Sequence, residues 1–206
     1  MIRPQDRPLS ENDLRPGPLQ QFAAWFDEAG RSGQVEPEAM ALATAGAGGA
    51  PSVRMVLMKA VDERGLVFFT NYASRKAGEL EANPQAALLF HWPALGRQVR
   101  IEGTVERVTR GETEAYAHRR SRSSQLSALA SPQSRPVPSR SWLEERVAAL
   151  DRPGELAVSE EWGGYRLEPQ AWEFWQHRAN RLHDRFRYTP AQPGETSGWT
   201  IERLGP

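Results

Sequence analysis

Residues 97–108, with the sequence RQVRIEGTVERV, restrict the possible folds more than any other segment, because apolar and polar side chains alternate along them. Successive side chains of an extended chain point to opposite faces. One face therefore carries Val99, Ile101, Gly103 and Val105, and the other carries charged and amide side chains. A strand that buries only one face is typical of antiparallel sheets, since parallel strands are usually buried on both faces.

Further short segments rich in strand-forming residues lie on both sides of this one. Strands are predicted over residues 39–45, 52–61, 66–71 and 85–92 before it, and over 163–169, 171–176, 181–188 and 199–204 after it. The separators GAGGAP and DERG are short enough for hairpins. We expect a mainly β fold, an antiparallel barrel that is closed or split, with helices packed on its outside.

The helical segments lie between these strands. Helices are predicted over residues 19–29, 75–82, 112–120, 123–131 and 141–150. Ser141 and Glu144 have the spacing of a capping box for the last of them. Residues 1–18 contain four prolines and few large apolar side chains, so we expect a flexible N-terminal arm followed by a single domain over residues 19–206.

The composition excludes several kinds of chemistry. The chain has no cysteine, which excludes disulfides, thiolate nucleophiles, cysteine-ligated zinc and iron–sulfur clusters, so any redox chemistry must belong to a cofactor. The four histidines lack metal-ligand spacing, and GxSxG, Walker A and GxGxxG motifs are absent from the sequence. We therefore expect no metal site, and neither a hydrolase nor a nucleoside triphosphatase.

The charges balance, with 26 basic and 26 acidic residues, so no net field attracts the chain to nucleic acid or to an anionic membrane. No apolar run approaches the roughly 20 residues of a membrane-spanning helix, and the first residues, MIRPQDRPLSENDL, lack the apolar core of a signal peptide. We expect a soluble cytoplasmic protein in which local clusters recognise anions.

Only two of the 26 basic residues are lysines, Lys59 and Lys76. Such a lysine either marks a place that needs a compact ammonium or is there by chance. Lys76 follows Ser74 and Arg75 at the predicted start of a helix, where the macrodipole already disfavours cations. A bound anion would reverse this effect, so the cluster predicts a phosphate site, with a solvated helix end as the alternative.

Arg54 and Lys59 lie near the two ends of one predicted strand. Strand parity places them on opposite faces, so they need not bind the same group unless a bulge redirects one of them. The alternative for Lys59 is an edge-strand lysine that discourages aggregation.

A third cluster, residues 116–140, contains five arginines and no acidic residue, with serines and glutamines between them. This composition suits a phosphate monoester, an RNA-binding surface or a solvated arginine-rich face equally well.

A fourth cluster is RLHDRFRY, residues 181–188. If it is extended, Arg181, His183 and Arg185 point to one face, where they repel one another unless an anion lies between them. We expect His183 to be functional, although a lone histidine is usually structural.

Seven motifs in order resemble the pyridoxine/pyridoxamine 5'-phosphate oxidase family. They are RMVLMK (54–59), VFFTNYASRKAGEL (67–80), RQVRIEG (97–103), SSQLSALASPQS (123–134), WGGY (162–165), EFWQ (173–176) and RLHDR (181–185). The resemblance covers roughly residues 19–206. It implies an FMN-binding split barrel that works as a homodimer, with two active sites at the subunit interface.

The resemblance also assigns residues to roles. FMN-binding residues would be Arg54, Lys59, Thr70, Arg75, Lys76, Gln98, Trp175 and Arg185, with Gln133 and Ser134 from the partner subunit. The substrate phosphate would be held by Lys59, Tyr116, Arg120 and Ser124. Arg181 and His183 would bind the substrate beside its reacting carbon as the catalytic pair, and His183 has the pKa range needed to accept a proton.

The implied activity is oxidation of pyridoxamine or pyridoxine 5'-phosphate to pyridoxal 5'-phosphate, with O2 as acceptor and H2O2 as product. The alternatives are a related oxidase of another planar substrate, such as a phenazine precursor, and a non-catalytic module that binds flavin or nucleic acid. Three positions depart from the family pattern, Ser121 in place of proline and Ser127 and His177 in place of glycine. We expect the two serines to loosen the loop that carries Arg120 and Ser124.

Overall fold

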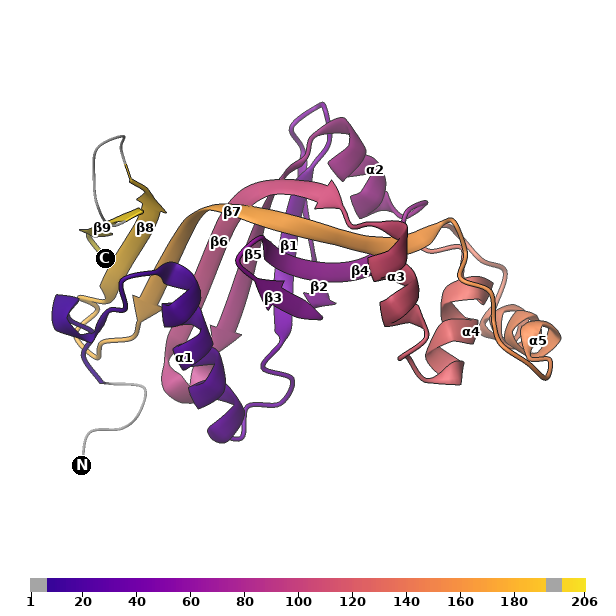
Figure 1. The fold of residues 1–206 in the computed structure, drawn as a ribbon, viewed down its shortest axis with the longest axis horizontal. Coiled ribbons are helices and arrows are strands. Elements are labelled where there is room, and N and C mark those ends of the chain that lie inside the picture. Colours follow the sequence, from indigo (N-terminus) through magenta and orange to yellow (C-terminus); the bar gives the residue numbers. More distant parts are fainter. Residues whose placement is uncertain (1–6, 192–197) are drawn as a thin grey trace.

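The computed structural model describes residues 7–191 and 198–206, which form one nine-stranded sheet in which every pairing is antiparallel (Figure 1). Its strands are β1 (Ala39–Ala45), β2 (Pro51–Leu57), β3 (Ala60–Asp62), β4 (Gly65–Asn71), β5 (Gln85–Trp92), β6 (Arg97–Arg107), β7 (Trp162–Gln176), β8 (Asp184–Pro190) and β9 (Trp199–Arg203). The sheet order is β2-β1-β5-β6-β7-β4-β3, and β8 and β9 continue beside β7. The predicted antiparallel split barrel with outer helices is confirmed.

The long strand β7 runs across nearly the whole molecule (Figure 1). One edge of β7 pairs with β6, while the other pairs first with β4 and then with β8. The prediction of two separate strands here, 163–169 and 171–176, is wrong. A register shift at Glu102/Gly103 of β6 lets Gln170 bulge out next to Pro169, so the strand continues past a proline that cannot donate to the ladder.

The predicted strand 52–61 is also wrong, because the chain changes partners in its middle. The N–H of Met58 donates to the Glu38 carbonyl on the β1 side, at 3.0 Å. The N–H of Lys59 donates to the Val67 carbonyl in β4, at 2.8 Å. The switch ends β2 and passes the chain from the β1 side to the β4 side of the sheet.

In the part of the chain that the structure describes, five α-helices lie outside the sheet. They are α1 (Pro18–Arg31), α2 (Arg75–Ala82), α3 (Arg110–Ala117), α4 (Arg122–Ala130) and α5 (Arg140–Leu150). Helix α1 buries Phe22 and Trp25 against aromatic residues of β5 and β7, whereas α4 and α5 extend from the end opposite to β8 and β9 (Figure 1). The predicted capping box of α5 is wrong, because Ser139 accepts the Trp142 N–H and forms the cap.

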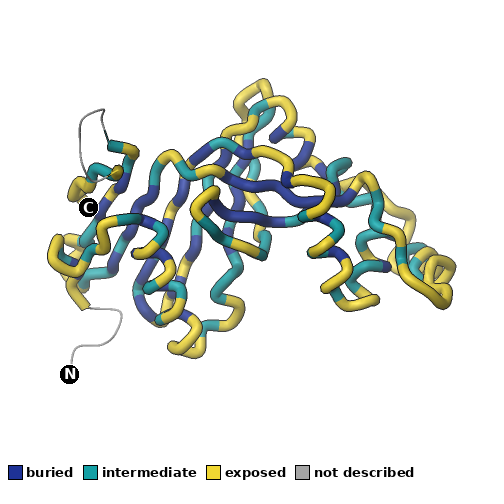
Figure 2. Tube along the Cα trace, in the orientation of Figure 1, coloured by how far each residue is buried: buried dark blue, intermediate teal, exposed yellow. Residues whose placement is uncertain are grey.

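The two faces of the sheet differ in burial, and the buried strands form the centre of the molecule (Figure 2). Met40, Leu42, Leu88 and Phe90 are fully buried on the face that α1 covers, and the predicted alternation in β6 is confirmed. On the opposite face Val53 and Met55 of β2 are 68% and 64% exposed. We call this exposed face the open face. It also carries Ala41, Ala43 and Leu89, which lie beside Val53 and Met55 in the strand register.

The chain before α1 packs on the end of the sheet formed by β8 and β9. Leu9 is buried and its N–H donates to Asp184, while Glu11 pairs with Arg203 at 2.8 Å. Residues 1–6 of the expected arm lie outside the described residues. None of the described helices is long and apolar enough to cross a membrane.

Candidate active site

A cleft of about 450 Å³ opens between the end of β2, β4, and helices α2 to α4. We call it the cationic cleft, because it is lined by Arg54, Lys59, Lys76 and Arg120 and, among the described lining residues, by no carboxylate. Thr70, Tyr116 and Gln133 complete the predicted residues found here. The break after β2 therefore brings Arg54 and Lys59 to one cleft, although strand parity alone separates them.

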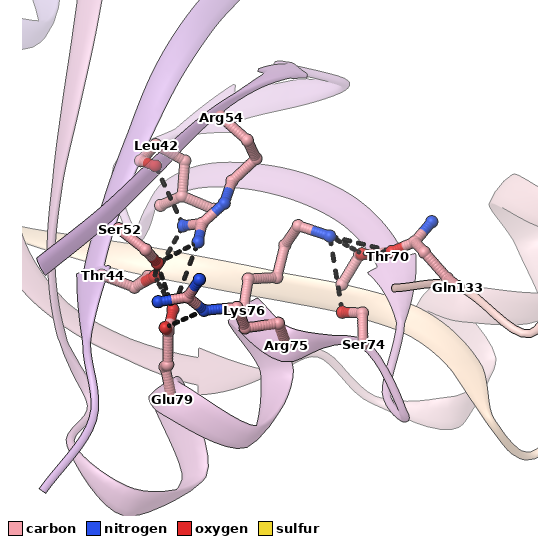
Figure 3. Close-up of polar contacts among 10 residues, drawn as sticks. All are labelled: Leu42, Thr44, Ser52, Arg54, Thr70, Ser74, Arg75, Lys76, Glu79 and Gln133. Carbon is pink, nitrogen blue, oxygen red and sulfur yellow. Dashed lines mark hydrogen bonds and ion pairs between the residues drawn. The ribbon is translucent and has the colours of Figure 1, made fainter. Parts of the chain in front are cut away.

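Lys76 lies at the centre of the polar contacts in this cleft (Figure 3). Its side chain comes from the first turn of α2, and the residue is only 8% exposed. Nζ donates to Gln133 Oε1 at 2.8 Å, Thr70 Oγ1 at 3.0 Å and Ser74 Oγ at 3.4 Å. Burial, together with the charge of Arg54, lowers the pKa of Lys76 to about 8. An ammonium whose direct contacts are all neutral favours a bound anion.

Arg54 binds a carboxylate that the sequence analysis missed, Glu79 of α2 (Figure 3). The Arg54 guanidinium also donates to the Leu42 carbonyl and to the hydroxyls of Thr44 and Ser52. These four acceptors fix its orientation at the edge of the cleft.

Arg75 also pairs with Glu79, at 2.8 Å, and its side chain is 65% exposed. The residue is not among those that line the cationic cleft. The i,i+4 spacing from Arg75 to Glu79 is the signal that could have identified Glu79 from the sequence.

Glu79 is expected to make stability depend on pH. Burial alone would raise its pKa, but hydrogen bonds from Ser52, Thr44 and the two arginines outweigh burial and lower the pKa to about 2. A lowered pKa adds stability that is complete above the unfolded-state value, near 4.5, and is lost as the pH falls toward 2. We expect Glu79→Gln to lower the free energy of unfolding at pH 7 by about 1–3 kcal/mol.

Urea unfolding of both proteins at pH 7 and at pH 3 measures this effect. The difference between wild type and Glu79→Gln should shrink at the lower pH. An equal difference at both pH values would show that the charge of Glu79 is not what stabilises the fold.

An aromatic stack positions Tyr116 in the cationic cleft. The Tyr116 ring lies 4.0 Å from that of Phe69, which stacks on Trp162 at 5.4 Å. The Arg120 guanidinium lies over Trp162, 4.7 Å from the ring centroid. Gly163 beside Trp162 leaves room for Tyr72, because a Cβ there would lie 2.2 Å from the Tyr72 hydroxyl. A Cβ on Gly164 would lie 2.9 Å from the Phe69 ring, so this second glycine of WGGY allows the close packing of the stack.

The serines that depart from the family pattern, Ser121 and Ser127, make hydrogen bonds in the segment that carries Arg120 and Ser124. Ser121 caps α4 by accepting the Ser124 N–H, and its hydroxyl donates to the Ser124 hydroxyl at 2.8 Å. The Ser127 hydroxyl donates to the Ser123 carbonyl one turn earlier. Both serines therefore make local hydrogen bonds, and the expectation that they loosen the loop stays a prediction.

Three other predicted flavin residues lie in a second cleft, of about 340 Å³, on the open face. Gln98, Trp175 and Arg185 line it together with Arg100 and Glu173. Glu173 is buried and binds Arg100 at 2.8 Å and Arg185 at 2.7 Å. The sequence analysis missed Glu173, although opposite charges on neighbouring strands are a recognisable signal.

His183 lies next to this second cleft, and Arg181 belongs to the same turn between β7 and β8. The predicted strand 181–188 is wrong at its start, because β8 begins at Asp184 and Arg181 has a φ of +66°. Arg181 and His183 therefore lie before the strand that carries Arg185, and the prediction that all three point to one strand face is wrong. The His183 ring instead lies 4.5 Å from that of Trp175, which places it at the border of the cleft.

The two clefts lie toward opposite ends of β7. Trp162 lines the cationic cleft and Trp175 the second cleft, and roughly 40 Å of extended strand separates them. Gln133 contacts Lys76 of its own chain. This contact differs from the expectation that the partner subunit supplies Gln133. Ser134, the next residue, has a φ of +67° and is exposed.

No three histidine or carboxylate side chains gather closely enough to hold a metal ion within residues 7–191 and 198–206. The cationic cleft is instead suited to anions.

Comparisons with known proteins agree over nearly the full chain. Residues 26–151 match the family described as pyridoxamine 5'-phosphate oxidase, and residues 162–206 match the pyridoxine 5'-phosphate oxidase C-terminal dimerisation region. The pyridoxine/pyridoxamine 5'-phosphate oxidase of Cupriavidus taiwanensis is 54% identical over 96% of this chain and 93% of its own. That of Salinibacter ruber is 51% identical over the same shares.

Among solved structures, PhzG from Burkholderia lata, in complex with tetrahydrophenazine-1-carboxylic acid, superimposes with a TM-score of 0.89. It is 31% identical, over 98% of this chain and 100% of its own. An FMN-binding protein from Nostoc punctiforme related to pyridoxamine 5'-phosphate oxidase has a TM-score of 0.75 at 19% identity, covering 94% of this chain and 100% of its own. The latter likeness supports the fold alone.

The curved antiparallel sheet, with the cationic cleft at one end and a second cleft on its open face, is that of a flavin-binding split barrel. Its C-terminal part, residues 162–206, is the region through which such chains dimerise. The chain belongs to the pyridoxine/pyridoxamine 5'-phosphate oxidase family.

Proposed function

We propose that this chain is an FMN-dependent oxidase that converts pyridoxamine 5'-phosphate and pyridoxine 5'-phosphate to pyridoxal 5'-phosphate. O2 accepts the electrons and becomes H2O2, and the amine substrate also takes up water and releases ammonia. The observation that carries the proposal is the cationic cleft, where four cations converge without a carboxylate among the described lining residues. Such a cleft suits two phosphates, one from the cofactor and one from the substrate.

The residues around Lys76 fit the phosphate of FMN. The buried ammonium contacts neutral oxygens only, and the Ser74 side chain does not cap the first N–H groups of α2. An anion at this helix start would satisfy both. We assign Arg54, Thr70, Arg75, Lys76, Gln133 and Ser134 to the phosphate and ribityl end of FMN, and Gln98, Trp175 and Arg185 of the other subunit to its remainder, with Lys59 between cofactor and substrate.

The substrate phosphate is assigned to Lys59, Tyr116, Arg120 and Ser124. Burial raises the pKa of the Tyr116 phenol even though Arg120 and Arg119 oppose the shift, so the phenol is protonated at neutral pH and can donate. FMN supplies the acceptor for the hydride that leaves the substrate's C4'. The chain would hold the phosphate, and we assign Arg181 and His183 to the substrate ring.

We expect Arg120→Ala to raise KM for pyridoxamine 5'-phosphate by roughly 10- to 100-fold with little change in kcat, because the phosphate contact is similar in the ground and transition states. Arg140→Ala is the matched control, since the side chain of Arg140 is exposed and the residue does not line the cleft. Steady-state kinetics on both variants measure the effect. A fall in kcat at unchanged KM would assign Arg120 to another role.

The proposed active unit is a homodimer, in which the cationic cleft of one subunit meets the second cleft of the other. The open face supports this assembly. It carries the exposed Val53 and Met55 of β2, and the paired strands β1, β5 and β6 extend the same sheet to the second cleft. Residues 19–206 form one oxidase domain in this proposal, the N-terminal arm precedes it, and the enzyme works in the cytoplasm.

The absorption spectrum of the purified protein tests the function. Bound FMN gives flavin bands that should bleach when pyridoxamine 5'-phosphate is added without oxygen and return when O2 is admitted. If the flavin bands did not bleach with this substrate but bleached with a reduced phenazine precursor, the result would favour oxidation of a phenazine precursor, in line with the likeness to PhzG. A substrate without a phosphate would leave Lys59, Tyr116 and Arg120 without their expected partner.

A further inference from the structure

His183 makes one hydrogen bond that defines the state of its ring. Its Nδ1 accepts the backbone N–H of Arg178, with 3.1 Å between the two nitrogens. A backbone N–H is always a donor, so Nδ1 must keep its lone pair. A neutral imidazole carries one proton, which must then lie on Nε2. The ring therefore offers an N–H donor, and its only lone pair is already used.

The groups around His183 favour this neutral form. His177 at the end of β7 lies 5.3 Å from it between ring centroids, and Arg178 and Arg181 belong to the same turn. The nearby carboxylate, Asp184 of β8, already accepts from the Leu9 N–H and from Arg203. Burial first, and then His177 and Arg181, lower the pKa of His183, while Asp184 opposes them. A second proton on the ring would also break the bond from Arg178.

We infer that His183 acts as a neutral hydrogen-bond donor through Nε2–H toward an acceptor atom of the substrate, and that the Arg178 backbone N–H fixes this tautomer. This inference rests on the proposed oxidase function. It replaces the role of proton acceptor expected from the sequence. His177, which stands where the family pattern has glycine, adds a second imidazole that disfavours a charged His183.

The chemistry of the proposed reaction is compatible with a donor. A substrate amine that binds uncharged has a nitrogen lone pair, which forms the new C=N bond as hydride leaves the adjacent carbon. The iminium that results is hydrolysed by water, and no proton passes to the protein in the hydride step. With the alcohol substrate, the hydroxyl proton passes to solvent water.

Three variants separate a donor from a base. His183→Gln keeps an N–H donor near the position of Nε2, whereas His183→Asn reaches only the position of Nδ1, and His183→Ala has neither. We expect the anaerobic rate of flavin reduction by pyridoxamine 5'-phosphate to be about tenfold higher in His183→Gln than in the other two, the factor that one ordinary hydrogen bond supplies. The flavin absorbance of each variant confirms that it has folded and holds FMN.

A base would give another result. Equal rates in all three variants, about a hundredfold or more below wild type, would identify His183 as a proton acceptor and overturn the inference.

Nitrogen-15 NMR of the histidine-labelled holoenzyme tests the tautomer without substrate. The chain has four histidines, and His183→Gln identifies the signals of this one. We expect a pyridine-type shift for Nδ1 and a pyrrole-type shift for Nε2. A proton on Nδ1 would overturn the inference. This measurement does not depend on turnover. If the flavin bands of the wild type did not bleach with pyridoxamine 5'-phosphate, the proposed function would be refuted, and the NMR shifts would still decide the tautomer.

Discussion

Replacing Lys76 with methionine is expected to weaken FMN binding by about 1.5–3 kcal/mol and to leave riboflavin binding nearly unchanged, because the lost interaction is a hydrogen bond to a charged phosphate. Lys76 is buried and has neutral contacts, so its charge is free to stabilise an anion. Methionine is a good match in length and removes only the charge and the donors. Fluorescence titrations of the apoprotein with FMN and with riboflavin measure the two affinities.

Arg140→Met is the control for the loss of one positive charge, since the side chain of Arg140 is 87% exposed and belongs to α5, away from the cleft. It should bind both flavins as the wild type does. If Lys76→Met lost FMN and riboflavin equally, Lys76 would support the structure of the cleft and would not bind the phosphate.

The second large effect is expected at the open face. Val53→Glu should dissociate the dimer and release FMN together, because a carboxylate buried against the partner without a counter-charge costs about 3–5 kcal/mol. Val53 is 68% exposed in the single chain and does not line the cationic cleft, so the substitution leaves the FMN contacts of its own subunit in place. Sedimentation and flavin absorbance, measured on the same samples, record both losses.

Val35→Glu is the matched control, because Val35 is another valine that is 79% exposed but lies outside the sheet, between α1 and β1. It should remain a dimer with bound FMN. A monomeric Val53→Glu that still held FMN stoichiometrically would mean that one chain contains the complete flavin site.

The sequence predicted the fold class well, because alternation is a local property that survives folding. In β6 the buried and exposed residues follow the predicted faces from Val99 to Val105. The errors arose where tertiary partners decide the backbone. The N–H groups of Met58 and Lys59 donate to carbonyls on the β1 side and the β4 side of the sheet. Strand β7 continues past Pro169 because a bulge forms where it pairs with β6.

The candidate site was predictable to a similar degree. Charge and motif identified the cations of the two clefts, but not the carboxylates that orient them, Glu79 for Arg54 and Glu173 for Arg185. The turn before β8 was missed because Arg181 adopts a left-handed conformation that its residue type does not favour. The bond from Arg178 to His183, and the tautomer it fixes, depend on that turn.

The central claim is that each active site is built from two copies of the chain, and mixed dimers test it most directly. A Lys76→Met chain has a defective cationic cleft, and an Arg181→Ala chain has a defective second half. When both are expressed together, half of the dimers are mixed, and each mixed dimer with twofold symmetry regains one intact site. We predict about a quarter of the wild-type rate of pyridoxal 5'-phosphate formation from the mixture, far above either variant alone. A mixture no more active than the mean of the two separate variants would contradict the claim and place the whole site within one chain.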